Sequence, residues 1–214
     1  MKNSTIISDA EGEACQTAKP VLIGILAIQG DFEAHGHSLD KLGTDGSVER
    51  RLVRVPGDFA GLDGIILPGG ESTTHIKLVD EENLREPLMA FAKCGGAIFG
   101  TCAGAILLAR EVRNPPQPSL GLMDIAVLRN GYGRQLASGV QRALTRLKDG
   151  PLEMVFIRAP IIESTGAAVE ILAEADGHPV LVRQGRILAA TFHPELTVDT
   201  AVHEYFLRLA RNGG

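Results

Sequence analysis

The chain has 214 residues, of which 44% are hydrophobic and 22% charged, a balance that predicts one globular domain with a sizeable core. Its net charge of -5 and its lack of tryptophan argue against nucleic-acid binding, which favours a basic surface and stacking aromatic side chains. No apolar run reaches the roughly 18 residues that a membrane span needs, and the N-terminal segment lacks the apolar core of a signal peptide. We therefore expect a cytoplasmic protein with no membrane partner.

The first structural elements are predicted after a polar N-terminal segment. Residues 1–19 are polar and aperiodic, typical of a disordered extension or a foreign remnant, and residues 20–214 are expected to form a single domain. The apolar run 21–28 predicts a strand covered on both faces, as in a parallel sheet. The turn 29–31 then leads into a helix that Gly43 ends. The inner face of this helix is predicted to carry Phe32, His35, Leu39 and Leu42.

Strands and helices continue to alternate up to residue 112. Segments 51–55 and 64–67 predict strands, and Leu84, Leu88 and Phe91 recur at helical spacing before Gly95-Gly96. This alternation predicts an α/β fold with an open, doubly wound, mostly parallel sheet. Ligands in such folds bind beyond the carboxyl ends of the strands. Three of these ends carry suggestive residues, at 29–31, 69–72 and 101–103.

The central motif is Gly100-Thr101-Cys102-Ala103-Gly104. An apolar run ends at its first glycine and another of helical length follows, as in the cysteine form of a nucleophile elbow. The glycines fit a sharp turn with no room for a Cβ atom, and a nearby helix N-terminus favours a thiolate. Cys15, Cys94 and Cys102 form no metal-spaced pair and no even disulfide set, so Cys102 is free to act. A small buried cysteine without chemistry is the competing interpretation.

The second half of the chain has a different pattern. A proline-rich surface loop is predicted at 114–118, and a final helix is predicted from about residue 198. Short β-like segments between them predict antiparallel strands added to the sheet, the last two as a hairpin turning at Gln184-Gly185. These segments are 122–128, 154–159, 169–174, 178–183 and 187–192. The inner stripe of the final helix is predicted to be Val198, Val202, Tyr205, Phe206 and Leu209.

A base for the cysteine is predicted at His193, which follows the last apolar strand. Residues two apart in extended backbone point to the same side, so Glu195 can reach the ring, and Pro194 limits movement between them. Cys102, His193 and Glu195 then supply nucleophile, base and orienting carboxylate. A surface turn is the competing interpretation. The other histidines are given no catalytic role. His35 is interpreted as a partly buried helix residue and His37 as a solvated one. No role is assigned to His75, His178 or His203.

Acyl transfer also needs donors for the oxyanion of the tetrahedral intermediate. The backbone N–H of Ala103, just after the nucleophile, is one candidate. Gly69 and Gly70, at a neighbouring strand end, offer N–H groups that no side chain obstructs. A plain turn would explain these two glycines equally well.

From Val21 to Leu209 the chain resembles the glutaminase subunits of two-component pyridoxal 5′-phosphate synthases, a family of class I, triad-type glutamine amidotransferases. The resemblance is carried, in family order, by segments 26–32, 67–73, 100–104, 129–135, 156–160 and 190–197. The elbow and His193-Pro194-Glu195 mark only the wider superfamily. The loop 69–73, the segment from Arg129 and the run 156–160 point to this family.

This resemblance implies a three-layer, flavodoxin-like fold and hydrolysis of L-glutamine to L-glutamate and ammonia. The ammonia would pass to a synthase subunit, in a hetero-oligomer that builds pyridoxal 5′-phosphate; no cofactor or metal is implied for the glutaminase. Cys102 would attack the amide carbon, His193 would transfer protons, and Glu195 would orient His193. Gly69 and Ala103 would form the oxyanion hole. The implied glutamine-binding residues are Gly70, Glu71, Ser72, Arg129, Ile157 and Arg158.

The chain departs from the family pattern at three positions. Gly131 and Gly139 stand where the resemblance predicts Ala and Phe, and Ala105 replaces a larger apolar residue. Two other functions stay open. A peptidase or chaperone of the wider superfamily would also use a cysteine and a histidine, and a regulatory module could carry an idle cysteine.

Overall fold

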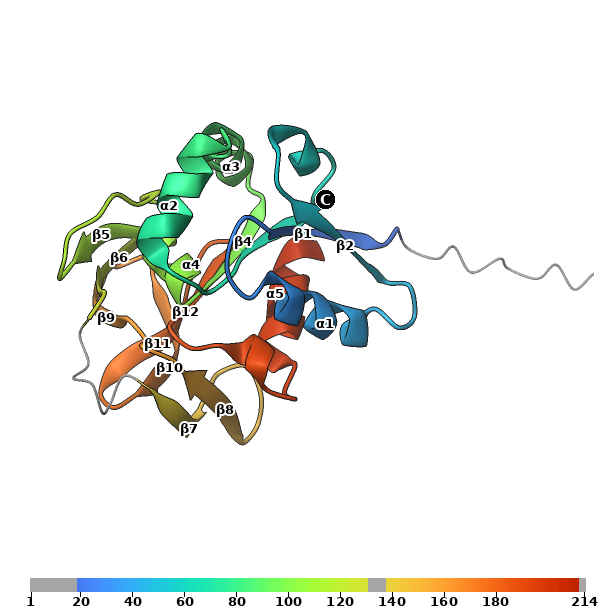
Figure 1. Ribbon diagram of the computed structural model, residues 1–214. Helices are drawn as coiled ribbons and strands as arrows, with labels where there is room; N and C mark the ends of the chain where they lie inside the picture. The colour runs from blue at the N-terminus through green and yellow to red at the C-terminus, as the bar shows by residue number, and fades with distance from the viewer. Residues whose placement is uncertain (1–18, 131–137, 212–214) are drawn as a thin grey trace, which may run out of the picture.

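The computed structural model describes residues 19–130 and 138–211. Its centre is a seven-stranded sheet in the order β10-β11-β12-β4-β3-β1-β2 (Figure 1). The predicted N-terminal extension falls outside the described residues, except for Lys19. The strands of this sheet are β1 (Val21–Leu26), β2 (Val48–Val53), β3 (Gly64–Leu67), β4 (Ala97–Thr101), β10 (Glu170–Ala175), β11 (His178–Gln184) and β12 (Ile187–Ala190).

The pairing confirms a mostly parallel sheet with added antiparallel strands. β2, β1, β3, β4 and β12 are parallel neighbours, an order that matches the flavodoxin-like arrangement. β11 pairs antiparallel with both β10 and β12. The predicted hairpin is present, and it turns at Gly185 with a φ of 58°, a conformation that glycine adopts without strain. The carboxyl ends of the parallel strands therefore share one edge of the sheet.

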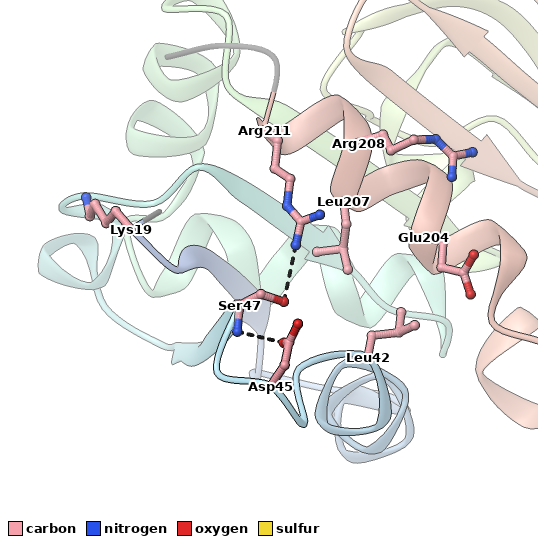
Figure 2. A pocket seen from close by; sticks show the side chains of 8 residues that line it. All are labelled: Lys19, Leu42, Asp45, Ser47, Glu204, Leu207, Arg208 and Arg211. Carbon is pink, nitrogen blue, oxygen red and sulfur yellow. Dashed lines mark hydrogen bonds between the residues drawn. The ribbon is translucent and has the colours of Figure 1, made fainter. Parts of the chain in front are cut away.

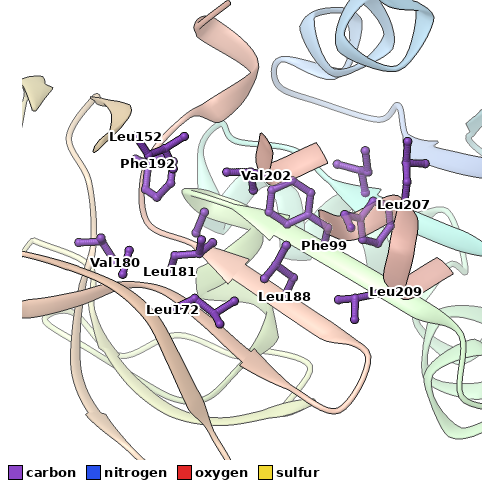
Figure 3. Packing of buried hydrophobic residues seen from close by; sticks show 14 of the residues in the cluster. Phe99, Leu152, Leu172, Val180, Leu181, Leu188, Phe192, Val202, Leu207 and Leu209 are labelled. Carbon is purple, nitrogen blue, oxygen red and sulfur yellow. The ribbon is translucent and has the colours of Figure 1, made fainter. Parts of the chain in front are cut away.

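Helices cover both faces of the sheet and enclose two hydrophobic cores. On one face α1 (Phe32–Leu42) and α5 (Ala201–Arg211) contribute to the core that contains Phe99 (Figure 3). On the other, α2 (Ser72–Glu81), α3 (Arg85–Lys93) and α4 (Ala103–Leu108) enclose the core that contains Ile98. Neighbouring residues of β4 point to opposite faces, which explains why its sequence is an unbroken apolar run.

The remaining strands form two smaller sheets, so the prediction that all β segments of the second half join the main sheet is wrong for 122–128 and 154–159. β6 (Met123–Leu128) lies between β5 (Ala109–Arg113) and β9 (Ile161–Thr165), and β7 (Gly139–Leu144) pairs with β8 (Pro151–Phe156). The apolar residues of β6 and β8 complete opposite cores. β7 was missed because most of its residues are exposed, which leaves no apolar alternation to detect.

The final helix begins later than predicted. Val198 is 90% exposed, so its placement in the inner stripe of the helix is wrong. The reason is local: Asp199 accepts a hydrogen bond from the N–H of Ala201 at 3.0 Å, and this contact fixes the start of α5 beyond Val198. Val202, Phe206 and Leu209 are buried as expected, and Tyr205 is partly buried against the same core.

A depression of about 660 Å³ lies between the end of α1 and α5 (Figure 2). Ser47, which precedes β2, accepts a hydrogen bond from Arg211 there at 3.3 Å. Lys19, which precedes β1, also lines it. The depression therefore lies at the amino ends of the parallel strands, opposite the edge where ligands bind in such folds. Among the described residues, no helix combines the length and apolar character needed to cross a membrane.

Candidate active site

Cys102 lies at a strained turn between β4 and α4. Its φ is 47° and its ψ -102°, values that a non-glycine residue rarely adopts and that cluster at functional sites. The turn is held because the Cys102 N–H donates to the carbonyl of Ala190 at 2.8 Å. A Cβ atom at Gly100 would lie 2.6 Å from the Gly104 backbone, and one at Gly104 would lie 2.0 Å from the Leu67 carbonyl oxygen. Both glycines are therefore required for this close packing.

His193 and Glu195 meet beside this turn. Nδ1 of His193 lies 2.7 Å from Oε1 of Glu195, and the Glu195 side chain is fully buried. The backbone between them is not extended, as the sequence interpretation assumed, but turns in the short 3-10 helix η2 (Pro194–Leu196). The two side chains meet because the turn brings them together. The N–H of His193 donates to the Val155 carbonyl at 2.8 Å, which anchors His193 to β8.

The surroundings of His193 favour its charged form. Burial lowers the pKa of the imidazole, but hydrogen bonds to Cys102 and Glu195, together with their negative charges, raise it to about 10. An imidazolium between a thiolate and a carboxylate is the arrangement that activates a cysteine nucleophile. Burial raises the pKa of Glu195, whereas the neighbouring histidines lower it, and the net pKa lies below its ordinary value. Glu195 is thus a charged partner for His193.

The loop after β3 closes over the same histidine. A Cβ atom at Gly69 would lie 2.4 Å from Cε1 of His193, so the imidazole packs directly on the Gly69 backbone. The loop is tied to the turn after β1, because the Asp31 N–H donates to the Gly69 carbonyl at 3.3 Å. Gly30 has a φ of 88°, and a Cβ atom there would lie 1.7 Å from that carbonyl oxygen. Two of the predicted strand ends are therefore in direct contact.

Gly69→Ala is expected to lower catalytic activity by about tenfold or more, because a methyl group would displace the His193 ring by more than the tolerance of catalytic geometry. Glycine is not required at position 69 for its φ, so the effect acts through the ring. Activity assays and thermal unfolding of the purified variant test this. Gly57→Ala is the matched control, since a Cβ atom there meets nothing within 4 Å. Equal activity of the two variants would contradict the prediction.

A pocket of about 110 Å³ opens beside Cys102. It is smaller than the roughly 300–1,000 Å³ of pockets for drug-sized ligands, and it suits a molecule the size of an amino acid. Every residue predicted to bind glutamine lines it, although the residues come from three distant segments. The lining residues are Gly70, Glu71, Ser72, Cys102, Ile106, Arg129, Asn130, Ile157 and Arg158.

Polar and charged groups converge on this pocket. Nη2 of Arg129 lies 3.2 Å from Oε1 of Glu71, and the arginine side chain is only 14% exposed. Burial raises the pKa of Glu71, but hydrogen bonds from Thr73 and Thr74 lower it to about 2. Glu71 is therefore a fixed negative charge beside a fixed positive one. Such a pair suits a ligand that carries both an ammonium and a carboxylate group.

Strained backbone also lines the pocket at Arg158, whose φ is 46°. The N–H of Arg158 donates to the Ser138 hydroxyl at 3.0 Å. The preceding Ile157 carbonyl accepts from the Cys102 thiol at 3.9 Å. The segment between β8 and β9 thus contacts Cys102 and forms part of the pocket wall.

Several residues near the site had no signal in the sequence. Ile106 and Asn130 line the pocket, and nothing in their pattern distinguished them from an apolar helix residue and a loop residue. His35 and His203 are fully buried, although His35 was expected to be only partly buried and His203 was given no role. Their joint placement behind Glu195 depends on contacts between the first and last helices, which helical periodicity does not reveal.

The described residues include one group whose donor atoms could approach a metal ion, Asp31, His193 and Glu195, with ligand atoms within 4.8 Å of one another. The Nδ1 atom of His193 is already paired with Glu195 at 2.7 Å. Asp31 is half-exposed and lies 4.0 Å from the same atom. A metal would have to displace the contact that orients the imidazole, so this arrangement fits an acid–base pair better than a metal site.

Buried histidines predict loss of stability in acid. Burial lowers the pKa of His75 to about 4 and that of His203 to about 3, whereas an unfolded histidine has a pKa of about 6.5. Below that pH the unfolded chain binds protons that the folded chain does not. The free energy of unfolding should therefore fall as the pH drops from 6.5 toward 4, by about 1.4 kcal/mol per pH unit for each such histidine.

Urea unfolding between pH 4.5 and pH 6.5 (about the window between these pKa values) checks this expectation. His75→Leu should reduce the pH slope by about 1.4 kcal/mol per pH unit, because neither ring nitrogen of His75 has a hydrogen-bond partner among the described residues and leucine removes the titration. His37→Asn, at an exposed position of the first helix, should keep the wild-type slope. A His75→Leu slope equal to that of the wild type would refute the assignment.

Comparison with known proteins gives a consistent family. Residues 25–212 match the SNO glutamine amidotransferase family model. A pyridoxal 5'-phosphate synthase subunit PdxT from Koribacter versatilis is 52% identical over 191 residues, covering 89% of this chain and 96% of the relative. Its counterpart in Deinococcus radiodurans is 50% identical over 193 residues, with 88% and 96% covered.

Solved structures agree with the fold. The crystal structure of a glutamine amidotransferase superposes with a TM-score of 0.82 at 45% identity, covering 88% of this chain and 98% of that chain. Another glutamine amidotransferase, from Thermotoga maritima, superposes with a TM-score of 0.60 at 11% identity, with 92% and 86% covered. The second similarity concerns the fold alone.

Proposed function

The chain belongs to the SNO glutamine amidotransferase family, and from this membership we propose that it hydrolyses L-glutamine to L-glutamate and ammonia for pyridoxal 5′-phosphate synthesis. The observation that carries the proposal is the pocket beside Cys102, because the six residues expected to bind glutamine line it together.

In the first half of the reaction, Cys102 attacks the side-chain amide carbon of glutamine as a thiolate. The backbone N–H groups of Gly69 and Ala103 stabilise the oxyanion that forms. His193 carries the thiol proton and donates it to the departing nitrogen. The C–N bond breaks, ammonia leaves, and a thioester joins the glutamyl group to Cys102.

In the second half, neutral His193 accepts a proton from water as the water oxygen attacks the thioester carbon. The C–S bond breaks, glutamate leaves, and the thiolate–imidazolium pair is restored. Glu195 keeps Nδ1 of His193 protonated, so that Nε2 serves the reacting atoms in both halves. The short contact between Nδ1 and the carboxylate supports this division of roles.

The substrate's own charges fit the pocket. Free glutamine carries a carboxylate and an ammonium group, and the pocket holds Arg129 and Arg158 together with Glu71. The arginines suit the carboxylate, and Glu71 suits the ammonium group. A peptide bond inside a protein would bring neither free charge to these positions, so the arrangement favours a free amino acid over a peptidase substrate.

The partner is proposed to be the synthase subunit, because the relatives that match most of this chain are subunits of pyridoxal 5'-phosphate synthase. The ammonia formed at Cys102 would be consumed there. We propose that residues 20–214 act as one amidotransferase domain in the cytoplasm and that residues 1–19 take no part in the chemistry.

The deciding experiment measures glutamate release by the purified chain with and without the synthase subunit. We expect release in the complex, with glutamine protecting Cys102 from labelling by a diazo-ketone analogue of glutamine. Since a partner can be needed to activate the subunit, the complex is the decisive sample. Labelling that glutamine does not prevent would favour a different substrate, and absence of both release and labelling in the complex would favour an idle cysteine.

A further inference from the structure

A buried pair of histidines lies behind the carboxylate of Glu195. Oε1 of Glu195 contacts His193 at 2.7 Å, and its other oxygen, Oε2, lies 3.5 Å from Nε2 of His35 on α1. Nδ1 of His35 lies 3.0 Å from Nε2 of His203 on α5. The side chains of His35 and Glu195 are fully buried, and so is His203. The contacts form a continuous chain from the base to the last helix.

The contacts favour one assignment of the ring protons. A neutral histidine has one N–H, and the other nitrogen presents a lone pair. If the proton of His35 were on Nδ1, the lone pair of Nε2 would face the carboxylate of Glu195. With the proton on Nε2, His35 donates toward Glu195 and toward the Thr101 hydroxyl, 3.1 Å away. Nδ1 of His35 then accepts from Nε2–H of His203.

This assignment also accounts for the unpaired atoms. Oε2 of Glu195 and Nδ1 of His203 have no partner at full hydrogen-bonding geometry among the described residues. In this assignment the last atom in the series of contacts, Nδ1 of His203, carries an unpaired lone pair. The opposite assignment would leave an unpaired N–H buried there. Oε2 of Glu195 has the Nε2–H of His35, shared with Thr101, within reach. A proton on Nε2 of His35 would give the second oxygen of the carboxylate a donor.

Both histidines stay neutral in this environment. Burial lowers the pKa of His35; Glu195 and Asp31 raise it, His193 lowers it, and the net pKa lies below its ordinary value. Burial, with help from His35 and Lys41, lowers the pKa of His203 to about 3 even though Glu195 raises it. Both rings are nearly perpendicular to the ring of Phe99, whose centroid lies 6.0 Å from that of His35 and 5.8 Å from that of His203. His35 therefore donates a hydrogen bond without adding a charge, which leaves the charge of Glu195 for His193.

We propose that His35 is a positioning residue for glutamine hydrolysis, donating its Nε2–H to the second oxygen of Glu195, and that His203 holds His35 in the required tautomer. The inference rests on the proposed function of the Cys102 site. It adds that the orientation of Glu195 in this site depends on side chains from α1 and α5. It assigns a role to the only two buried histidines that lie within hydrogen-bonding distance of each other among the described residues.

Two substitutions at position 35 separate positioning from packing. The amide nitrogen of glutamine can occupy the place of Nε2, whereas that of asparagine ends near Nδ1. In the complex with the synthase subunit, His35→Asn should lower kcat by about tenfold to a hundredfold, the range for a lost hydrogen bond to a charged group, with KM within about twofold. His35→Gln should restore kcat to within about threefold of wild type. His37→Asn on the exposed face of the same helix is the control.

The pH dependence adds a readout that packing alone would not move. Catalysis needs ionised Glu195, and loss of its donor raises the pKa of the carboxyl group. The acid limb of kcat should therefore move to higher pH in His35→Asn and return in His35→Gln. If His35→Asn does not fold, His203→Phe tests the same series of side-chain contacts from its other end, because phenylalanine removes the N–H that donates to Nδ1 of His35. This variant should lower kcat by about threefold to tenfold.

A spectroscopic measurement distinguishes this inference from the proposed function. In the free chain, the proton on Nδ1 of His193 should give a downfield NMR resonance that moves in His35→Asn and returns in His35→Gln. A wild-type complex without glutaminase activity would overturn the proposed function but leave this resonance test intact. If the wild-type complex is active, the inference is overturned when His35→Asn and His35→Gln have the same kcat and the same pH profile and neither substitution moves the resonance.

Discussion

Cys102→Ala should lower glutamate release by about 10⁴-fold or more, because the reaction loses the atom that forms the thioester, and loss of a nucleophile removes most of a triad's contribution. The substitution adds no steric conflict, since alanine only removes the sulfur and the turn keeps its φ of 47°. The thiol is buried, and its contact with the Ile157 carbonyl is a weak one. Binding of the synthase subunit should therefore be unchanged.

The measurement compares glutamate release and complex formation for the wild type, Cys102→Ala and Cys94→Ala. Cys94 is exposed and free, so its replacement controls for the loss of a thiol. We expect Cys94→Ala to match the wild type in both assays. Wild-type release by Cys102→Ala would exclude the covalent mechanism, and loss of complex formation would show that the thiol serves assembly as well.

Glu195→Gln should lower kcat by about 10²–10⁴-fold, as for the corresponding change in other triads. Both carboxylate oxygens face a histidine nitrogen, His193 at 2.7 Å and His35 at 3.5 Å. A carboxylate accepts at both oxygens, but an amide has one oxygen and one NH₂ group. One of the two histidines would therefore face a donor and have to change its tautomer, which misplaces a proton at the site.

The assay of this variant needs a control for the loss of a negative charge. Glu111→Gln serves, because Glu111 is exposed and pairs with Arg113 at the surface. We expect Glu111→Gln to keep wild-type kcat. In Glu195→Gln the pKa of His193 should fall, since the carboxylate that raises it is gone. A kcat close to wild type, with an unchanged His193 titration, would rule out the orienting role.

The parallel half of the molecule was predicted well where its strands are uninterrupted apolar runs followed by a turn, as in β1, β3 and β4. β2 contains three charged residues, and its prediction at 51–55 missed its start at Val48. β3 was placed with its correct bounds, and α1 with its stop at Gly43. The three strand ends named from the sequence do meet: Gly69 contacts Gly30 and His193, and Cys102 lies at the end of β4. Topology alone brings such ends to one edge, which is why the loop 69–72 could be placed beside Cys102 from the sequence pattern. Arg129, Ile157 and Arg158, which also line the pocket, were named only from the family resemblance.

The second half was harder to predict because its strands pair in small sheets. Nothing in the alternation of β6 or β8 tells which edge each strand will join. The same limit applies to the backbone at His193, where an extended segment was assumed and a 3-10 turn is present. At Gly139, one of the departures from the family pattern, a Cβ atom would meet nothing within 4 Å, but the φ of 159° is one that other residues rarely adopt, so the backbone conformation and not crowding favours glycine there. Gly131 lies outside the described residues.

The position of β4 has a consequence for the order of synthesis. Its neighbour β3 precedes it in the chain, but β12 (Ile187–Ala190), its other neighbour, is translated much later. Until β12 emerges from the ribosome, β4 is an open edge, and the N–H of Cys102 lacks the Ala190 carbonyl that it binds in the folded chain. A nascent or prematurely ended chain therefore carries the cysteine without its base. Glutamine hydrolysis is therefore deferred until β12 and His193 have been translated.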